Sequence, residues 1–253
     1  MKRVVALLLF ALATTPITAQ RAIEQTFAAG ETLDYELTWL GVTGATARMT
    51  IAPIAGNRMR LTSIAASTSG FARVYKVRDE IESIIDASDF STLTYRKHLN
   101  ERGRVKDDRT VVDDKSHLAT RTRPGKPPQQ IKISPPVFDP LSLVYHLRTL
   151  ELTPGKVHRF TVLADGKVYT LVATVLKRET IKTDAGTFRC VTVEPKMQGG
   201  GLYRDDDDSS LLISYSDDES HIPVRIRSEV KVGTITVTLR RVISGVTAVE
   251  PPK

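Results

Sequence analysis

The stretch DPLSLVYHLRTLEL, from Asp139 to Leu152, decides the fold, because it is the one segment with helical spacing in a chain that otherwise alternates. Asp139 can accept hydrogen bonds from the first free N–H groups of a helix, and Pro140 suits the first helical position, where its missing N–H is not needed. A Pro-Gly pair at residues 154–155 marks the helix end. The apolar residues recur every three or four positions, the period of a helix and not of a strand, at Leu141, Val144, Tyr145, Leu147 and Leu150. We therefore predict one amphipathic helix from Asp139 to Leu152, with its apolar face packed on or inside a sheet.

Most of the remaining chain alternates between apolar and polar residues, which is typical of half-buried β-strands. The segment from Glu31 to Leu40 is the clearest example, and Asp165-Gly166 between two such segments is a strong hairpin signal. From Arg123 to Pro140 the sequence is rich in proline, and we expect a linker there with one short strand from Gln130 to Ile133. About a dozen antiparallel strands tend to curl or to split into layers. The predicted fold is therefore mainly β: a large, strongly curved antiparallel sheet, either a half-barrel or a two-layer sandwich, with the helix packed on or in it.

The first residues, MKRVVALLLFALATTPITA, have the pattern of a secretory signal peptide: a basic start, an apolar run and a small-residue cleavage site near Ala19. A membrane anchor is the alternative, but the apolar run is shorter than the roughly 20 residues that a membrane span needs. We therefore expect an exported protein of the periplasm or cell envelope. Residues 1–19 would be the signal peptide, residues 20–248 a single β domain and residues 249–253 a frayed tail.

The charge pattern argues against nucleic acid as a partner. The formal net charge is +7, but basic and acidic residues alternate along most segments and no dense Lys/Arg block stands out, whereas a nucleic-acid binder concentrates its cations on one face. The outward positions of the clearest strands carry charge, so lipid-facing strands are not expected and membrane association would be at most peripheral. Cys190 is the only cysteine, so no internal disulfide can form.

No catalytic, metal or cofactor motif is recognisable. The five histidines show no ligand spacing, and the run from Asp205 to Asp208 lacks the glycine and terminal glutamate of a calcium loop. We find no GxSxG, SxxK or Cys-His pattern in the mature chain. The sequence therefore predicts no cofactor, no metal and no catalytic residue.

Three residues are candidates for ligand binding. Tyr145 and Arg148 are three residues apart and share a helix flank, where an aromatic ring and a guanidinium can line the mouth of a cavity. The alternative is that Tyr145 packs on the sheet while Arg148 pairs with a strand carboxylate. Trp39, the only tryptophan, ends a strand beside Gly41, where it can serve as a ligand contact or as a core or rim residue.

Four stretches together resemble an exported bacterial family, the domain of unknown function DUF3108. They are FAAGETLDYELTWLGVTGATA from Phe27, DPLSLVYHLR from Asp139, AGTFRCVTVEP from Ala185 and SYSDDESHIPVRI from Ser214. Their order and spacing span roughly residues 27 to 240. Tyr215 and His221 stand where the family often has tryptophan and a basic residue. The resemblance implies an envelope protein of mostly antiparallel β structure, and it implies no activity.

Three functions remain open from the sequence. The first is a non-enzymatic binder of a lipid or lipid-linked glycan in a concavity of the curved sheet, with the helix as a lid. The second is a structural or interaction module that docks an envelope partner through exposed strand edges or loops. The third is a hydrolase of a cell-wall polymer, which would need two carboxylates, or a histidine and a carboxylate, that converge in a cleft.

Overall fold

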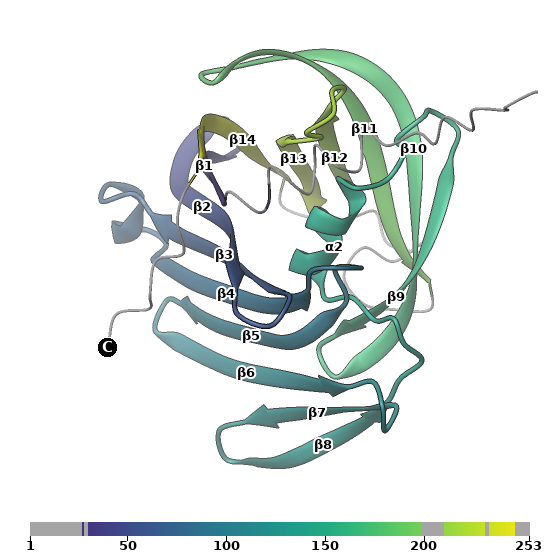
Figure 1. The fold of residues 1–253 in the computed structure, drawn as a ribbon. Helices are drawn as coiled ribbons and strands as arrows, with labels where there is room; N and C mark the ends of the chain where they lie inside the picture. The colour runs from purple at the N-terminus through teal and green to yellow at the C-terminus, as the bar shows by residue number, and fades with distance from the viewer. Residues whose placement is uncertain (1–26, 28–29, 199–209, 231–232, 246–253) are drawn as a thin grey trace, which may run out of the picture.

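Fourteen strands form one antiparallel sheet in the computed structural model, which describes residue 27 and residues 30–198, 210–230 and 233–245 (Figure 1). The predicted signal peptide (1–19), the predicted frayed tail (249–253) and the run from Asp205 to Asp208 lie outside the described residues.

The elements up to and including the helix α2 have the following bounds: β1 (Glu31–Trp39), β2 (Val42–Ile54), β3 (Arg58–Ser67), the short 3₁₀ helix η1 (Phe71–Arg73), β4 (Val77–Asp86), β5 (Thr92–Glu101), β6 (Arg104–Asp113), β7 (Leu118–Arg123), β8 (Lys126–Lys132) and α2 (Pro140–Leu147). The remaining strands are β9 (Val157–Ala164), β10 (Lys167–Thr183), β11 (Gly186–Gln198), β12 (Ser210–Ser216), β13 (Pro223–Val230) and β14 (Gly233–Ser244).

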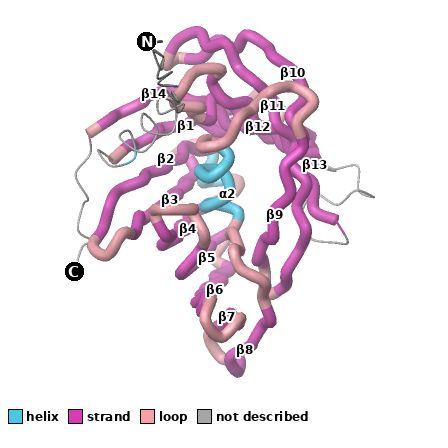
Figure 2. Tube along the Cα trace, turned by 45° about the vertical axis from the view of Figure 1, so that its right-hand side comes forward, coloured by secondary structure: helices cyan, strands magenta, loops and turns pink. Residues whose placement is uncertain are grey.

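The sheet consists of two meanders that meet at the pair β1–β14. Its order is β8-β7-β6-β5-β4-β3-β2-β1-β14-β13-β12-β11-β10-β9, so β8 and β9, which flank α2 in the chain, are the two edges. The strands curl around α2 (Figures 1 and 2). The mainly β, antiparallel prediction with one helix is confirmed. Because all fourteen strands belong to one open sheet, the half-barrel alternative describes the fold and the two-layer sandwich does not.

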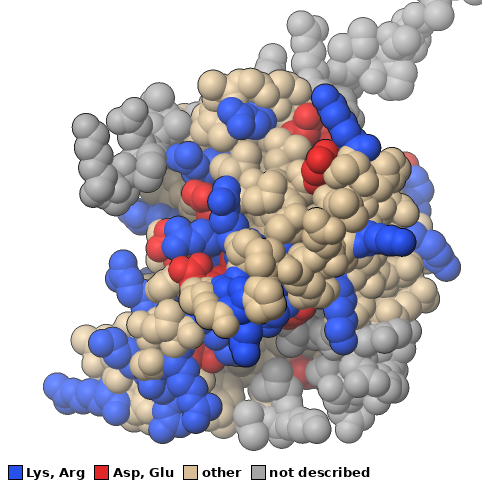
Figure 3. All heavy atoms as spheres, turned by 90° about the horizontal axis from the view of Figure 1, so that it is seen from below, with Lys and Arg blue, Asp and Glu red and all other residues tan. Residues whose placement is uncertain are grey.

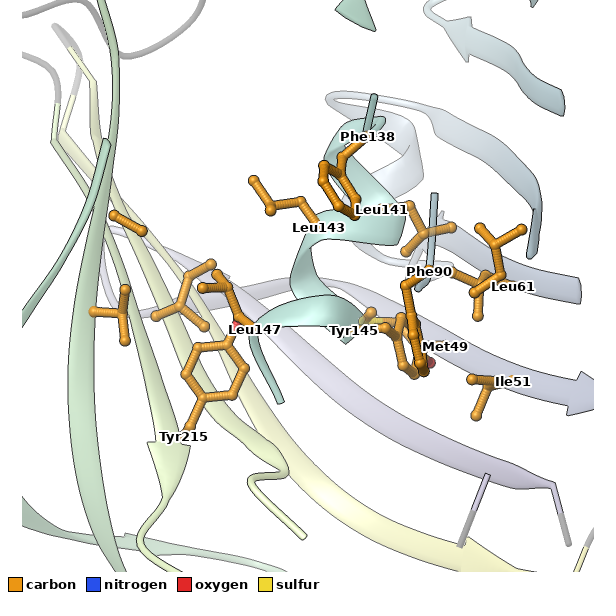
Figure 4. Close-up of a cluster of buried hydrophobic side chains, with 14 of the residues drawn as sticks. Met49, Ile51, Leu61, Phe90, Phe138, Leu141, Leu143, Tyr145, Leu147 and Tyr215 are labelled. Carbon is orange, nitrogen blue, oxygen red and sulfur yellow. The ribbon is translucent and has the colours of Figure 1, made fainter. Parts of the chain in front are cut away.

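Helix α2 lies inside the curve of the sheet and is buried on most of its circumference, as expected of a helix that a protein encloses. Its side chains pack between the β1–β4 wall and the β11–β14 wall (Figure 4). The helix residues in this core are Leu141, Leu143, Tyr145 and Leu147, and the strand residues around them include Leu33, Met49, Ile51, Leu61, Val191, Ile213, Tyr215 and Leu239.

The segment that leads into α2 bridges the edge strand β9 and the strand β5. The Phe138 N–H donates to the Thr161 carbonyl (2.9 Å), and the Leu163 N–H donates to the Phe138 carbonyl (2.8 Å), which adds a short parallel bridge to β9. On the other side the Thr92 N–H donates to the Val137 carbonyl (2.9 Å). Residues 137–139 therefore connect β5 with β9 at one end of the open side.

Two predicted boundaries are wrong. The helix ends at Leu147 and not at Leu152, because the Arg148 carbonyl accepts a hydrogen bond from the His221 ring (2.9 Å) and the chain turns there. The proline-rich segment holds a full strand, β8, where only a short strand from Gln130 was expected. Since β8 is an edge, Pro127 and Pro128 sit where a missing backbone donor is tolerated.

Candidate functional site

The N-terminus of α2 is fixed by a buried polar network around Asp139. The carboxylate accepts hydrogen bonds from the Leu141 and Ser142 N–H groups (2.8 and 2.9 Å) and from the Thr92 hydroxyl (2.7 Å). The Ser83 hydroxyl donates to the same carboxylate, and the Ser142 side chain accepts from the Asp139 N–H (2.9 Å), which completes a capping box. Burial raises the pKa of Asp139, and the four hydrogen bonds oppose that rise. The network ties the helix start to β4 and β5.

The C-terminus of α2 is fixed by a buried ion pair. The Arg148 guanidinium donates to both carboxylate oxygens of Glu31 on β1, at 2.6 and 2.9 Å, and its Nε donates to the Ser220 carbonyl at 3.1 Å. The side chains of Arg148 and Glu31 are 0% and 1% exposed. Burial opposes the charge on Arg148, but the hydrogen bonds and charge of Glu31 outweigh it and hold the guanidinium pKa above its usual range. Charge-assisted bidentate pairing of this kind gives the helix one defined position.

Aromatic rings surround this ion pair. The Arg148 guanidinium carbon lies 4.7 Å from the centre of the Phe27 ring and 5.5 Å from that of Tyr145. Tyr145 is fully buried, which raises its pKa, and its hydroxyl has no hydrogen-bond partner within the described residues.

Of the three candidates from the sequence, the structure brings Tyr145 and Arg148 together and places Trp39 apart from them. Tyr145 and Arg148 lie in the interior, so a ligand-binding role for either stays a prediction that requires α2 to move. Trp39 lies at the end of β1, 38% exposed, on the part of the molecule where β1 turns into β2. A ligand role for Trp39 stays a prediction as well.

A pocket of about 580 Å³ opens beside α2, between the helix and the turns that join β2 to β3 and β4 to β5. Its inner wall is apolar and aromatic, and its outer part carries the exposed side chains of Asn57, Ser88 and Asp89. The inner wall is formed by Phe27, Met59, Ala87, Phe90, His146, Thr149 and Leu150. An apolar interior with a few polar groups at the mouth is the usual composition of a small-molecule site.

His146 is one of two polar residues on the inner wall of this pocket, with Thr149. Its ring stacks on Phe138 with centroids 4.6 Å apart, and Phe160 meets it edge-on at 5.6 Å. Burial lowers the pKa of His146 to about 4, so the imidazole is neutral near pH 7. Its Nδ1 atom is buried and has no hydrogen-bond partner within the described residues. A bound molecule would reach this nitrogen only if the side chains that cover it moved.

Two further hollows are lined by more charged residues. One, of about 600 Å³, lies over β1–β3 and β14 and is lined by Arg48, Arg240 and Arg241 among others. Asp34 binds both Arg48 and Arg241 there, at 2.7 and 2.6 Å. The other, of about 550 Å³, lies beyond the end of α2. Within residues 30–198, 210–230 and 233–245, no group of three or more His, Cys, Asp or Glu side chains is placed to hold a metal ion.

Sequence reasoning did not select the residues that line the pocket. His146 was considered only as a metal ligand, and Phe90, with a backbone φ of 64°, occupies a turn that no periodic pattern describes. One signal was present: His146 lies four residues before Leu150, a spacing that puts the two on one helix flank, and both line the pocket.

The family follows from the sequence over most of this fold. Residues 34–240, which span β1 to β14, match the family described as "Protein of unknown function (DUF3108)". The chain belongs to the DUF3108 family. No curated protein matches the sequence.

Solved structures show the same fold. The "beta-barrel-like protein" of the DUF1849 family from Brucella abortus is 11% identical and has a TM-score of 0.55, and the match covers 86% of this chain and 98% of the Brucella chain. At this identity the likeness shows the fold alone.

Two weaker likenesses are to proteins with envelope descriptions. A protein with a YmcC-like fold from Bacteroides fragilis, described as exported, is 9% identical with a TM-score of 0.33 over 84% of this chain and 95% of that one. A protein from Parabacteroides distasonis, described as a lipoprotein, is 10% identical with a TM-score of 0.35 over 85% and 95%. Neither TM-score is high enough to carry an argument. Among the described residues of this DUF3108 chain, no helix has the length and apolar character needed to span a membrane.

Proposed function

We propose that this DUF3108 protein is a non-enzymatic, exported binder of an amphiphile, either a lipid or a lipid-linked glycan. The observation that carries the proposal is the pocket of about 580 Å³ beside α2. Its volume lies within the range of small-molecule sites, roughly 300–1,000 Å³.

The division of the pocket into an apolar wall and a polar mouth fits the two parts of an amphiphile. An acyl or isoprenoid chain would pack on Phe27, Met59 and Phe90, while a polar head would lie near Asn57, Ser88 and Asp89. The Nδ1 atom of His146, which has no partner among the described residues, would hydrogen-bond a polar group of the ligand once the side chains that cover it move. Each buried CH₂ of such a chain contributes about 0.8 kcal/mol.

The experiment is native mass spectrometry of the protein purified from its own envelope, followed by organic extraction and analysis of the released material. We expect a stoichiometric adduct that extracts as a lipid or glycolipid. A second measurement uses a fluorescent fatty-acid analogue with purified protein from which bound material has been extracted.

A pocket-filling variant makes the proposal falsifiable. Ala87→Phe places a ring inside the pocket and should weaken binding of the analogue at least tenfold. Ala52→Phe is the matched control, because Ala52 lies on the outer face of β2 and does not line the pocket. A clean apo mass together with no saturable analogue binding, or equal binding by both variants, would overturn the proposal.

A further inference from the structure

Three turns at one end of the half-barrel form a continuous surface, which we call the rim. They are the β1–β2 turn (residues 39–42), the segment 71–76 that follows β3, and the β5–β6 turn (residues 101–105). The Thr68 N–H donates to the Gly44 carbonyl (2.9 Å), and a Cβ on Gly44 would lie 3.2 Å from the Phe71 ring, so the first two turns are in contact. The Arg102 N–H donates to the Lys76 carbonyl (2.8 Å), and the Arg102 guanidinium lies over the Tyr75 ring. The second and third turns are therefore joined as well.

The rim exposes an unusual share of the large apolar side chains. Half of the exposed large hydrophobic residues within the described part of the chain lie on these three turns, with Val74 exposed to 74% and Leu40 to 65%. They are Trp39, Leu40, Val42, Val74, Tyr75 and Val105. Because these side chains stand at the tips of turns and not on a flat face, they can insert into a deformable surface that has no preformed pocket for them.

The rim is also basic. Arg73, Lys76, Arg102 and Arg104 are exposed, and none of them forms an ion pair with a carboxylate among the described residues. The one acidic residue in the three turns is Glu101. Elsewhere some exposed arginines are paired, as Arg96 is with Asp107 and Arg178 with Asp217. Figure 3, seen from below, shows Lys and Arg side chains across this face, with one group of them at its lower left.

We propose that the rim docks this protein on an anionic lipid bilayer. Exposed aromatic and aliphatic side chains interleaved with unpaired Arg and Lys match the polar–apolar boundary of a membrane whose headgroups are negatively charged. A tryptophan and a tyrosine in this setting act as interfacial anchors, since each has an apolar body and a polar edge. A protein partner would need a surface that matches the rim in both shape and charge. A bilayer needs only an apolar interior and anionic headgroups.

The rim and the pocket lie at opposite ends of the strands. The β2–β3 and β4–β5 turns that border the pocket are at the far ends of β2–β5 from the rim. A docked molecule would therefore present the pocket mouth away from the bilayer. Docking does not depend on what the pocket holds, so the two proposals can fail separately.

Trp39 makes the test direct, because it is the only tryptophan in the chain. Purified protein is mixed at low salt with vesicles of phosphatidylglycerol and phosphatidylcholine, and separately with pure phosphatidylcholine vesicles. We expect flotation with the anionic vesicles, a shift of the Trp39 emission to shorter wavelength, and quenching by brominated lipid. Binding should weaken as salt is raised.

Variants identify the surface. Arg102→Gln with Arg104→Gln should weaken partitioning into anionic vesicles by roughly ten- to thirtyfold, since each cation near such a surface contributes about 1 kcal/mol. The matched control is Lys115→Gln with Lys132→Gln, which removes the same charge from exposed positions at the opposite end. Val74→Ser should weaken binding about fivefold through lost apolar burial, with Val157→Ser, at the far end of β9, as its control.

The outcomes are distinguishable. The proposal is overturned by absence of flotation with anionic vesicles, by equal binding to neutral vesicles, or by an unchanged Trp39 emission in the vesicle-bound protein. It is also overturned if the rim variants and their controls bind alike.

Discussion

At the scale of single residues, one buried ion pair joins two of the stretches that carry the family's sequence pattern. Glu31 precedes most of the sheet and Arg148 follows the helix, yet they meet in a bidentate contact with almost no exposed area. Taking both charges out of water is costly, and a buried pair of this kind is a weak contributor to net stability. We expect its value to lie in specificity, because the other buried carboxylate of the described residues, Asp139, caps the opposite end of the helix.

Breaking this pair from one side leaves a buried charge without compensation. Arg148→Met should lower the free energy of unfolding by about 3–5 kcal/mol, and Glu31→Gln should lower it by a similar amount. The double variant should lose clearly less than the sum of the two, since neither charge then remains. Urea denaturation at pH 7 measures all three. Single variants that each cost under about 1 kcal/mol, or a strictly additive double variant, would show that the two residues are not coupled.

His146 gives the protein a pH dependence with a defined sign. Its pKa is lowered to about 4 in the folded state, whereas an unfolded histidine titrates near 6.5. Between these values the unfolded chain binds the proton more readily, so the stability contributed by neutral His146 is present above about pH 6.5 and is lost as the pH falls toward 4.

His146→Phe should remove this dependence while it keeps an aromatic ring against Phe138 and Phe160. From pH 7 to pH 4.5 the wild-type protein should lose about 2 kcal/mol more unfolding free energy than the variant. Urea midpoints at several pH values make the comparison. Parallel pH profiles for the two proteins would mean that His146 is accessible to protons in the folded state.

At the scale of elements, α2 depends on its first residue more than on its length. Asp139→Ala removes the N-cap, which costs about 1 kcal/mol, and strands the Ser83 and Thr92 hydroxyls in the interior. A loss of about 3 kcal/mol is therefore expected. Asp139→Asn keeps one carbonyl oxygen for the Leu141 and Ser142 N–H groups and should cost about 1 kcal/mol. Thermal or urea unfolding of both variants provides the measurement, and equal losses would contradict the role given to the capping oxygen.

The start of α2 could be predicted from the sequence and its end could not, for a physical reason. The Asp-Pro pair and the three-and-four spacing act within one turn, so residues 139–147 contain their own signal. The end at Leu147 is set by His221 and Ser220, which bond to Arg148 from more than seventy positions away. Strand β8 was missed in the same manner, because its prolines are acceptable only at a sheet edge, and an edge is a property of the whole sheet. The pocket was missed because Phe27, Phe90 and His146 come from three separate elements.

At the scale of the whole molecule, long-range pairing determines the shape. β1 pairs with β14 through contacts such as Leu33 with Val242, and no local pattern identifies that partner. The pairing joins the two meanders into one sheet and leaves β8 and β9 as the edges of the opening that α2 fills. Curvature was predictable from the number of strands, whereas the position of the opening was not.

The far part of this opening is narrowed by side chains that reach across it. The Arg121 guanidinium on β7 donates to the Asp165 carbonyl in the β9–β10 turn (2.6 Å), Gln129 on β8 donates to the Gly166 carbonyl (3.0 Å), and Lys97 pairs with the Asp165 carboxylate. Gly166 permits this approach: its φ is +79°, and a Cβ there would lie 2.6 Å from the Arg121 Nη1 atom. We call these contacts to the β9–β10 turn the seam. They join side chains to that turn and lack the backbone hydrogen bonds that pair neighbouring strands. The seam should therefore open more readily than any pair of neighbouring strands.

Arg121→Met tests the seam. Hydrogen exchange should become about tenfold faster in β7, β8 and the β9–β10 turn, since the free energy of local opening falls by about 1–2 kcal/mol, while β1, β2 and β11–β14 should be unchanged. Arg96→Met is the matched control: it breaks the Arg96–Asp107 pair on β5 and β6 but removes nothing from the seam. If both variants accelerate the same amides, the effect belongs to the loss of an arginine from the β5–β7 region. If neither variant accelerates exchange, the opening is held closed by the bridge through Val137 and Phe138 and by the buried side chains behind it. The seam then contributes little to closing it.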